Sequence, residues 1–452
     1  MTIPDEDAVA TLVAKLARHG QFAEAFCEDT HLVAAALEGE QVTGLRSATR
    51  RGAAFRLERD TAIWFACTAD LSGPGLAEAA RSIVSSPLSQ PPSRMASPPE
   101  PGACDELLSS FAAMMDSLRT VREQARAAEP AVSSVRAQAR VVRRRVRIVT
   151  ADGGERTDLT YRTSLSIRTV ARHGGKRHGG FAGWARAGTF TALTADDVAG
   201  TARLAGQRAG RRLRAAAAPA GRLPVIFAPG GGGILFHEAC GHCMEADSVR
   251  RGAAAFAGRL GERVADSMVS LVDDGTVPQG WGSSGCDDEG NPTRRTVLVD
   301  RGCLRGYLAD SYSGRVLGIP AANGRRQNYR CQPASRMTNT FLLPGQDDPA
   351  EIVRQTRRGI YCVELGGGSC TVPTGDFTFT ATDAFLIENG EITTPLPELT
   401  LVGNGPEVLR LIDAVGTDFG THTGSCGKDG HYVPVSDGNP TVRVQMLTVG
   451  GR

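Results

Sequence analysis

The feature that most constrains the fold is a change of character near the middle of the chain. Residues 195–218 are rich in Ala and Arg, which is typical of a long helix, and Pro219-Ala220-Gly221 interrupts them. Helix-like and strand-like segments alternate before this break, whereas short strands, turns and glycines prevail after it. Since 452 residues also exceed one compact core, the sequence predicts an α+β fold with two domains. These are a mixed N-terminal domain at 1–218 and a β-rich C-terminal domain at 219–452.

The expected helices and strands follow from apolar periodicity. Val9, Val13 and Leu16 recur at helical spacing within 8–19. Residues 85–102 are rich in Pro and Ser and predict an exposed loop. The remaining predictions are helices at 74–85, 105–128 and 195–218, strands at 53–57, 63–66 and within 139–171, and a hairpin at 295–302.

Charge and composition exclude several classes of protein. The net charge of +2, from 51 basic and 49 acidic residues, gives no reason to expect nucleic acid or a membrane as the main partner. No run approaches the ~20 apolar residues that span a bilayer, and the acidic first residues do not resemble a signal peptide. The 11 cysteines are odd in number and scattered, which is unlike a disulfide framework. We therefore expect a cytoplasmic protein.

Residues 235–242 carry the candidate chemistry, because His237 and His242 are one residue further apart than the histidines of the H-E-x-x-H zinc motif. On a regular α-helix they would point about 140° apart. They can share a metal only if the helix ends or contains a one-residue π-type bulge between them, and Gly241 favours such a bulge.

If both histidines bind zinc as neutral imidazoles, Glu238 is placed to accept a proton from water and return it to the leaving amine. The alternative is a pair of ordinary histidines beside a helix cap. Catalytic zinc needs a third protein ligand, and residue chemistry leaves five candidates: Glu245, Asp247, His422, Cys426 and His431. Cys426 is only slightly favoured over the other four candidates, because it lies in a glycine-rich turn with Lys428 nearby.

Two other motifs could also indicate a functional site. Cys240 and Cys243 form a C-x-x-C, which is found in disulfide oxidoreductases and zinc knuckles, but no thioredoxin-like pattern and no second cysteine pair accompany it. Residues 230–233 are four glycines, which predict a tight turn in preference to a backbone surface for substrate. No Gly-Lys-Ser/Thr follows them, so nucleotide binding is not expected.

The H-E-x-x-x-H segment, with Glu245 and Asp247 after it, resembles the TldD/PmbA metalloproteases. The resemblance is dense after about residue 222 and looser before it. The segments that carry it are 236–242, 250–252, 272–276, 287–290, 323–326, 333–340, 366–368, 387–390, 426–430 and 440–441. Cys240, Cys243 and the four glycines depart from that pattern, as does the Pro/Ser-rich stretch.

This resemblance implies zinc bound by His237, His242 and Cys426, with Glu238 as the catalytic base. It implies the TldD-like, metal-bearing member of a heterodimer whose TldE/PmbA-like partner encloses the site. The expected function is cleavage of small or unstructured peptides, including maturation of peptide antibiotics or other natural products. An alternative is a zinc amide hydrolase acting on a small biosynthetic intermediate. A non-catalytic scaffold is disfavoured, because a structural zinc site would not need Glu238.

Overall fold

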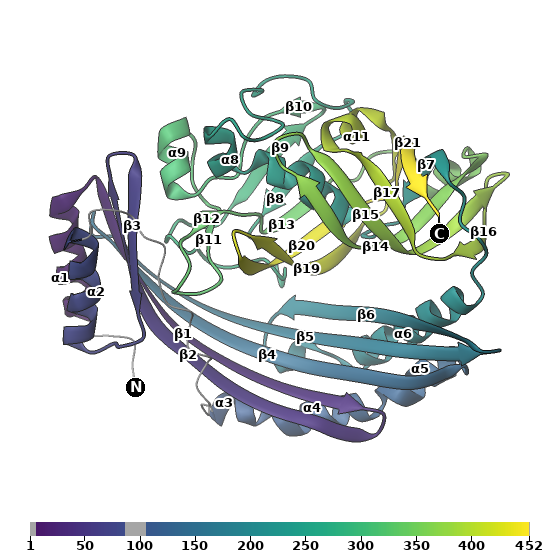
Figure 1. Cartoon of the computed structure of the whole chain (residues 1–452), viewed down its shortest axis with the longest axis horizontal. Helices are drawn as coiled ribbons and strands as arrows, with labels where there is room; N and C mark the ends of the chain where they lie inside the picture. Colours follow the sequence, from purple (N-terminus) through teal and green to yellow (C-terminus); the bar gives the residue numbers. More distant parts are fainter. Residues whose placement is uncertain (1–5, 86–104, 452) are drawn as a thin grey trace.

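The computed structural model describes residues 6–85 and 105–451. The N-terminal part forms a six-stranded antiparallel sheet in the order β3-β2-β1-β4-β5-β6. Strands of 19 residues reach ~60 Å, and the sheet curves beneath the C-terminal part (Figure 1). The strands are β1 (Phe22–Glu38), β2 (Gln41–Arg59), β3 (Ala62–Thr68), β4 (Val132–Thr150), β5 (Glu155–His173) and β6 (Lys176–Ala187).

Helices cover the outward face of this sheet. Because side chains alternate along a strand, odd-numbered β1 residues such as Ala25 and Val33 pack against them, burying two apolar cores. The N-terminus of α6 is held by a capping box between Thr194 and Asp197. The helices are α1 (Glu6–Leu16), α2 (Gly73–Ser85), α3 (Asp105–Leu108), α4 (Ser110–Arg119), α5 (Val121–Ala128) and α6 (Ala195–Leu213).

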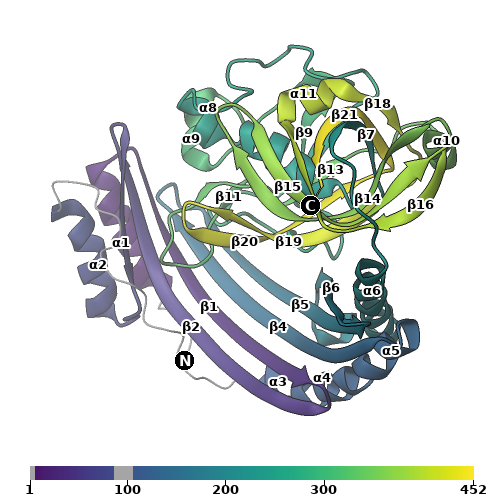
Figure 2. The same cartoon turned by 45° about the vertical axis from the view of Figure 1, so that its right-hand side comes forward.

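The opposite face of the sheet, here called the inward face, turns toward the C-terminal part (Figure 2). It carries the even-numbered β1 residues. Phe26 packs in a small apolar cluster with Tyr329 and Cys286 of the C-terminal part. Beside it, Glu24 Oε1 lies 2.6 Å from Arg326 Nη2. Apolar contacts and buried ion pairs therefore attach this end of the sheet to the C-terminal part.

The C-terminal part contains two large sheets and one small one. The first is six-stranded in the order β10-β9-β8-β13-β20-β19, so β19 is an edge strand, and β11 pairs with β12 separately. Its strands are β8 (Leu271–Asp274), β9 (Arg295–Asp300), β10 (Cys303–Leu304), β13 (Asn339–Leu342), β19 (Gly420–Lys428) and β20 (His431–Asn439), with β11 (Gly324–Arg325) and β12 (Ala334–Ser335) beside them.

In the other large sheet, the pairings β14-β7-β21-β17-β15-β14 close a ring around an apolar core. Strands β16 and β18 are attached to β15 and β21. The strands are β7 (Gly221–Phe227), β14 (Arg358–Thr371), β15 (Asp376–Glu388), β16 (Glu391–Leu396), β17 (Leu399–Asn404), β18 (Ile412–Val415) and β21 (Val442–Gly450). The α-helices are α7 (Gly233–Leu235), α8 (Ala246–Arg250), α9 (Ser311–Leu317), α10 (Pro349–Arg354) and α11 (Gly405–Leu411).

The predicted α+β fold with a β-rich C-terminal part is confirmed, whereas the division into domains at residue 219 stays a prediction. The helix predicted at 195–218 ends earlier, at Leu213, and the one predicted at 105–128 is divided into three. Strand β6 was not predicted. The predicted loop at 85–102 lies, except for Ser85, outside the described residues. Within the described ranges, no helix is long and apolar enough to cross a membrane.

Candidate metal centre

The predicted helix bulge is present between the two motif histidines. After α7, residues Phe236–Gly241 form a π-helical turn, and His242–Met244 follow as a 3₁₀ turn. A Cβ atom at Gly241 would overlap the sulfur of Met337, so only glycine fits this packing. The two imidazole rings lie 5.3 Å apart, centroid to centroid, and perpendicular to each other. The extra residue is thus absorbed by the π-turn, and both rings reach one place.

Cys426 of β19 joins the two histidines, although it lies 184 residues beyond His242. One potential ligand atom from each of His237, His242 and Cys426 lies within 4.8 Å of the others, and all three side chains are buried. Cys426 Sγ is 3.3 Å from His242 Nε2. Both ring nitrogens of His237 are buried and, among the described residues, form no hydrogen bond of regular geometry, although the Cys426 thiol is close enough to raise the pKa of this imidazole. Two imidazoles and a thiol are a donor set that suits zinc, and an orphaned buried imidazole is what a missing metal ion would explain.

The electrostatics of the cluster favour a thiolate. Burial alone would raise the pKa of the Cys426 thiol, but the positive charges of His237 and His242 outweigh it and hold that pKa well below its usual value. The pKa of His242 lies well above its usual range, because Glu245 and Cys426 outweigh the opposing effect of burial. A thiolate is the form of cysteine that binds metals, so the protein environment already prepares this ligand.

A buried chain of polar contacts orients His242 from behind. Glu245 Oε2 lies 2.9 Å from His242 Nδ1 and 2.9 Å from Lys428 Nζ. Lys428 also donates to Asp247 Oδ1 at 2.8 Å and to the carbonyl oxygen of Ser335 at 3.1 Å. Burial opposes the charge on Glu245, yet His242 and Lys428 lower its pKa to about 2. The carboxylate therefore accepts from Nδ1–H and leaves Nε2 directed toward the cluster.

Glu238 lies beside this cluster and not within it. Its Oε2 is 3.6 Å from His242 Nε2, and its side chain is 26% exposed, whereas that of His242 is only 7% exposed. A carboxylate that is partly open to water can exchange protons with a substrate or a water molecule. The geometry thus separates three buried donors from one accessible carboxylate.

Cys426 is the only one of the five third-ligand candidates that the structure brings to both histidines. Glu245 and Asp247 belong to the supporting chain around Lys428. His422 is 3.6 Å from Asp437. His431 lies 3.4 Å from Arg336, and burial together with that charge lowers its pKa to about 4.

Two family profiles match most of the chain. Residues 220–451 match a family profile described as the PmbA/TldA metallopeptidase C-terminal domain, and residues 108–213 match the central domain. The chain belongs to the TldD/PmbA metallopeptidase family. The resemblance found in the sequence is therefore confirmed.

Relatives of this metallopeptidase family include a "Metalloprotease TldD homolog" of Haemophilus influenzae. It is 37% identical over 342 residues, which are 74% of this chain and 71% of that protein. A "Zinc metalloprotease TldD homolog" of Saccharolobus solfataricus is 34% identical over 53% of this chain and 54% of its own length. The crystal structure of TldE from Thermococcus kodakarensis is 20% identical and covers 98% of this chain and 100% of its own, with a TM-score of 0.76. This last likeness shows the fold alone.

The two cysteines that depart from the TldD/PmbA pattern lie outside the donor cluster. Cys240 and Cys243 are fully buried in the apolar core. Burial raises the pKa of Cys240, and a contact with Cys370 together with burial raises that of Cys243. Neither joins the donor cluster found in the described residues. Protonated, buried thiols are poor nucleophiles, which weighs against the redox interpretation of this C-x-x-C.

The four glycines form the predicted tight turn. Gly230 has a φ of +77°, and Gly231 N donates to Ala228 O at 3.0 Å. A Cβ at Gly231 would overlap the carbonyl of Val363, so this turn packs against protein backbone. The lack of side chains in this turn allows α7 to pack closely against neighbouring segments.

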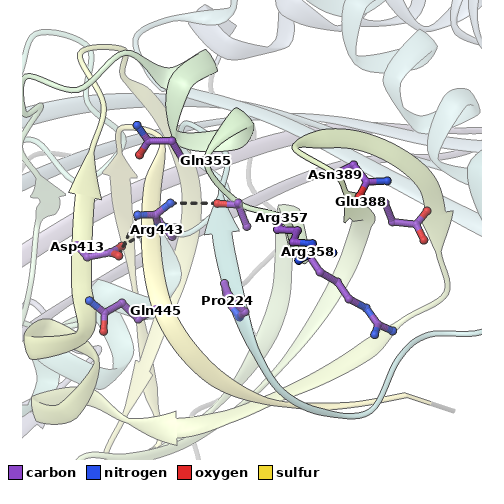
Figure 3. Close-up of a pocket in the computed structure, with 10 residues that line it drawn as sticks. Pro224, Gln355, Arg357, Arg358, Glu388, Asn389, Asp413, Arg443 and Gln445 are labelled. Carbon is purple, nitrogen blue, oxygen red and sulfur yellow. Dashed lines mark hydrogen bonds and ion pairs between the residues drawn. The ribbon is translucent and has the colours of Figure 1, made fainter.

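A separate pocket of about 750 Å³ is lined by none of the predicted site residues. Figure 3 shows Arg443 facing Asp413, which accepts from it at 2.8 and 2.9 Å. Arg357 and Arg358 lie exposed at its rim. The lining residues are Pro224, Gln355, Thr356, Arg357, Arg358, Glu388, Asn389, Asp413, Arg443 and Gln445. Its partly buried cation, Arg443, is already paired with Asp413, so this pocket does not compete with the metal centre.

Sequence reasoning missed the residues that support the donors. Glu245 was considered as a ligand and instead contacts His242 from behind. Arg336 is fully buried, and its Nη2 donates to the carbonyl oxygen of Cys426 at 2.6 Å. Nothing in local spacing indicates either contact, because each depends on how distant segments pack.

Proposed function

We propose that this chain is a zinc-dependent peptidase in which His237, His242 and Cys426 bind the ion and Glu238 is the catalytic base. The observation that carries the proposal is the convergence of the three donors within 4.8 Å, with the orphaned His237 imidazole among them. The family and the metalloprotease names of its relatives support the same reading.

Each side chain has a separate task. His237, His242 and the Cys426 thiolate supply three protein donors, which leaves a fourth position for water or substrate. Zinc held there would activate water and polarise the scissile carbonyl. Glu238 would accept a proton from water and deliver it to the leaving amine. Its partial exposure suits this shuttle, since both steps need access to the substrate.

The supporting chain keeps His242 in one orientation. Glu245 fixes the Nδ1–H tautomer, and Lys428 holds Glu245 in place through a 2.9 Å contact. Such partners behind a ligand commonly contribute 10–100-fold in metal affinity, by order of magnitude. Glu245 and Lys428 are therefore positioning residues, which act on the metal only through His242.

The proposed substrates are small or unstructured peptides. Cys426 lies on β19, an edge strand of its sheet. Trp281 and Arg336 already donate to the carbonyl oxygens of Gly424 and Cys426, so an extended chain would pair with the remaining backbone groups of this edge. We propose further that the chain works in the cytoplasm with a TldE/PmbA-like partner as a heterodimer, in peptide-antibiotic or natural-product maturation. Hydrolysis of an amide in a small biosynthetic intermediate would use the same residues.

The test is to measure zinc content and peptidase activity together, for wild type and Glu238→Ala, each with the partner subunit present. We expect about one zinc per chain in both proteins, as three protein donors imply, and turnover only in the wild type. Zinc in both proteins without cleavage of any peptide or pathway amide would favour a structural site. Absence of metal from the wild type would contradict the assignment of the three ligands.

A further inference from the structure

The inward face of the first sheet has an end whose arginines form no ion pair with the C-terminal part among the described residues. Strand register places the residues of this end in rows, since directly paired residues point to the same face. We call the three rows below the far end of the inward face. They are Arg46–Ala34–Arg140–Ser164–Ala185, Gly44–Ala36–Gln138–Ser166–Gly183 and Glu38–Arg136–Arg168–Phe181.

The floor of the far end is made mostly of small side chains. Ala34, Ala36 and Ala185 are apolar and short, and a Cβ at Gly44 would meet no other atom within 4 Å. From this floor Arg46, Arg140 and Arg168 rise as exposed side chains. Small neighbours leave these guanidinium groups accessible to another molecule.

The three arginines lack carboxylate partners among the residues that the structure describes, and the near end of the same face differs. There Arg50 pairs with Glu28 at 3.1 Å and Arg144 with Asp288 at 2.8 Å. In the far end only Arg136 is paired, with Glu38 at 2.7 Å. Arg168 stacks on Phe181, 4.9 Å from the ring centroid.

The charges around Arg140 also indicate a local excess of positive charge. Although its surface is open to solvent, the surrounding protein partly desolvates Arg140, and this effect together with the positive charges of Arg50 and Arg46 lowers its pKa. The chain as a whole carries a net charge of only +2, so this concentration of unmatched cations is local. A concave surface with charge of one sign attracts ligands of the opposite sign.

The far end also adjoins the strand that carries Cys426. Arg162, which precedes Ser164 on the inward face, donates to the carbonyl oxygen of Trp281 at 3.0 Å. Trp281 Nε1 in turn donates to Gly424 O of β19 at 3.0 Å. β19 lies over β6 in both views (Figures 1 and 2). A cavity of about 400 Å³ is lined by Arg168 and Phe181 on one side and by residues of β19 and α7, His422, Thr423 and Ile234, on the other.

We propose that the far end of the inward face binds acidic segments of the substrate, so that this enzyme prefers extended peptides rich in Asp and Glu. The inference rests on the proposed peptidase function and adds a substrate class to it. Guanidinium groups bind carboxylates through two parallel hydrogen bonds, and Arg clusters are a common means of recognising acidic motifs. A peptide that runs along β19 would pass Arg168 while its backbone stays near Cys426, and acidic residues further along the peptide would reach Arg140 and Arg46 across the sheet.

The experiment uses the full chain in a Glu238→Ala background, so that peptides stay intact. The probes are a fluorescently labelled, unstructured peptide of alternating Glu and Ser, and the same peptide with Gln in place of every Glu. Fluorescence anisotropy gives the Kd of each. We expect the Glu peptide to bind about tenfold more tightly at low salt, as several exposed charge contacts allow. The preference should shrink at high ionic strength, because salt screens such contacts.

Two charge-matched variants decide where the preference originates. R46Q/R140Q should lose most of it, whereas R357Q/R358Q, which removes two exposed arginines at the pocket of Figure 3, should keep it. Circular dichroism and thermal melting check that both variants fold. Equal loss in both would assign the effect to net charge and overturn the proposal. So would a wild type without preference, or a face variant that keeps its preference for the Glu peptide and loses only binding to the partner subunit.

Zinc content separates this inference from the proposed function. R46Q/R140Q should hold as much zinc as the wild type and, with Glu238 restored, should cleave the Gln peptide equally well. A chain that binds zinc and cleaves both peptides equally would refute only the acidic preference. A chain without zinc that still prefers the Glu peptide would refute only the peptidase.

Discussion

Two buried polar clusters of this chain differ in how their charges are satisfied. Where the first sheet meets the C-terminal part, Glu24 lies 2.6 Å from Arg326 and 2.9 Å from Arg56. At the metal centre, both ring nitrogens of His237 are buried without a regular hydrogen bond among the described residues, whereas Arg56 and Arg326 at the junction each keep an ion pair although their Nε atoms are also unpaired. Burying a polar group without a partner costs free energy. The junction therefore has the properties of a structural cluster, and the metal centre those of a site completed by a ligand.

The largest expected effect is on catalysis. Glu238→Ala should lower kcat/KM by about 10²–10⁴-fold, the range that general acid–base groups contribute. Zinc content measured by atomic emission should stay unchanged, because Glu238 is outside the donor cluster. Glu238→Gln is the matched control for shape. A variant that loses zinc together with activity would move Glu238 into the donor set.

The junction should respond in stability. Arg326→Met leaves Glu24 with a single cationic partner in a buried place, and we expect the free energy of unfolding to fall by about 3–5 kcal/mol. Denaturant titration measures this change. The double variant Glu24→Met/Arg326→Met should cost less than the sum of the two single changes. Additive losses would show that the two charges do not stabilise each other.

An effect of intermediate size is expected for Glu245 and Lys428, the residues that orient His242. Glu245→Gln keeps the shape but removes the charge that contacts His242 Nδ1, so zinc affinity should fall by about 10–100-fold. Competition with a chelator measures the affinity without reference to catalysis. Lys428→Met should act in the same direction and more weakly, since Lys428 reaches His242 only through Glu245. Unchanged affinity in both variants would exclude the positioning role.

The smallest effect is expected at Cys240. Its thiol is buried in apolar surroundings and belongs to neither cluster. Cys240→Ala should destabilise the fold by about 1 kcal/mol and leave zinc content and activity as they are. Loss of zinc in this variant would restore the C-x-x-C as part of the metal site.

Most local structure could be predicted, and the misses have physical reasons. The helix predicted at 195–218 ends earlier, at Leu213. Its Ala-rich composition continues beyond that residue, but composition does not show where α6 loses the packing against the sheet that stabilises it. Strand β6 was missed because its glycines and charged residues give little apolar alternation, although it pairs along β5. The π-turn was predicted correctly, since the spacing of His237 and His242 allowed few other solutions.

The sequence by itself indicated many of the local elements, the need for either a bulge or a helix end between His237 and His242, and the family. These depend on spacing and residue type along short stretches. Only the tertiary structure decided which of five candidates approaches the histidines and that Cys240 and Cys243 lie outside the donor cluster. It also decided that three arginines of the first sheet lack carboxylate partners among the described residues, with Arg168 lining a cavity beside β19. The reason is that such contacts join residues far apart in the chain, as the 184 residues between His242 and Cys426 illustrate. Strand pairing and core packing set those distances, and local sequence does not encode them separately.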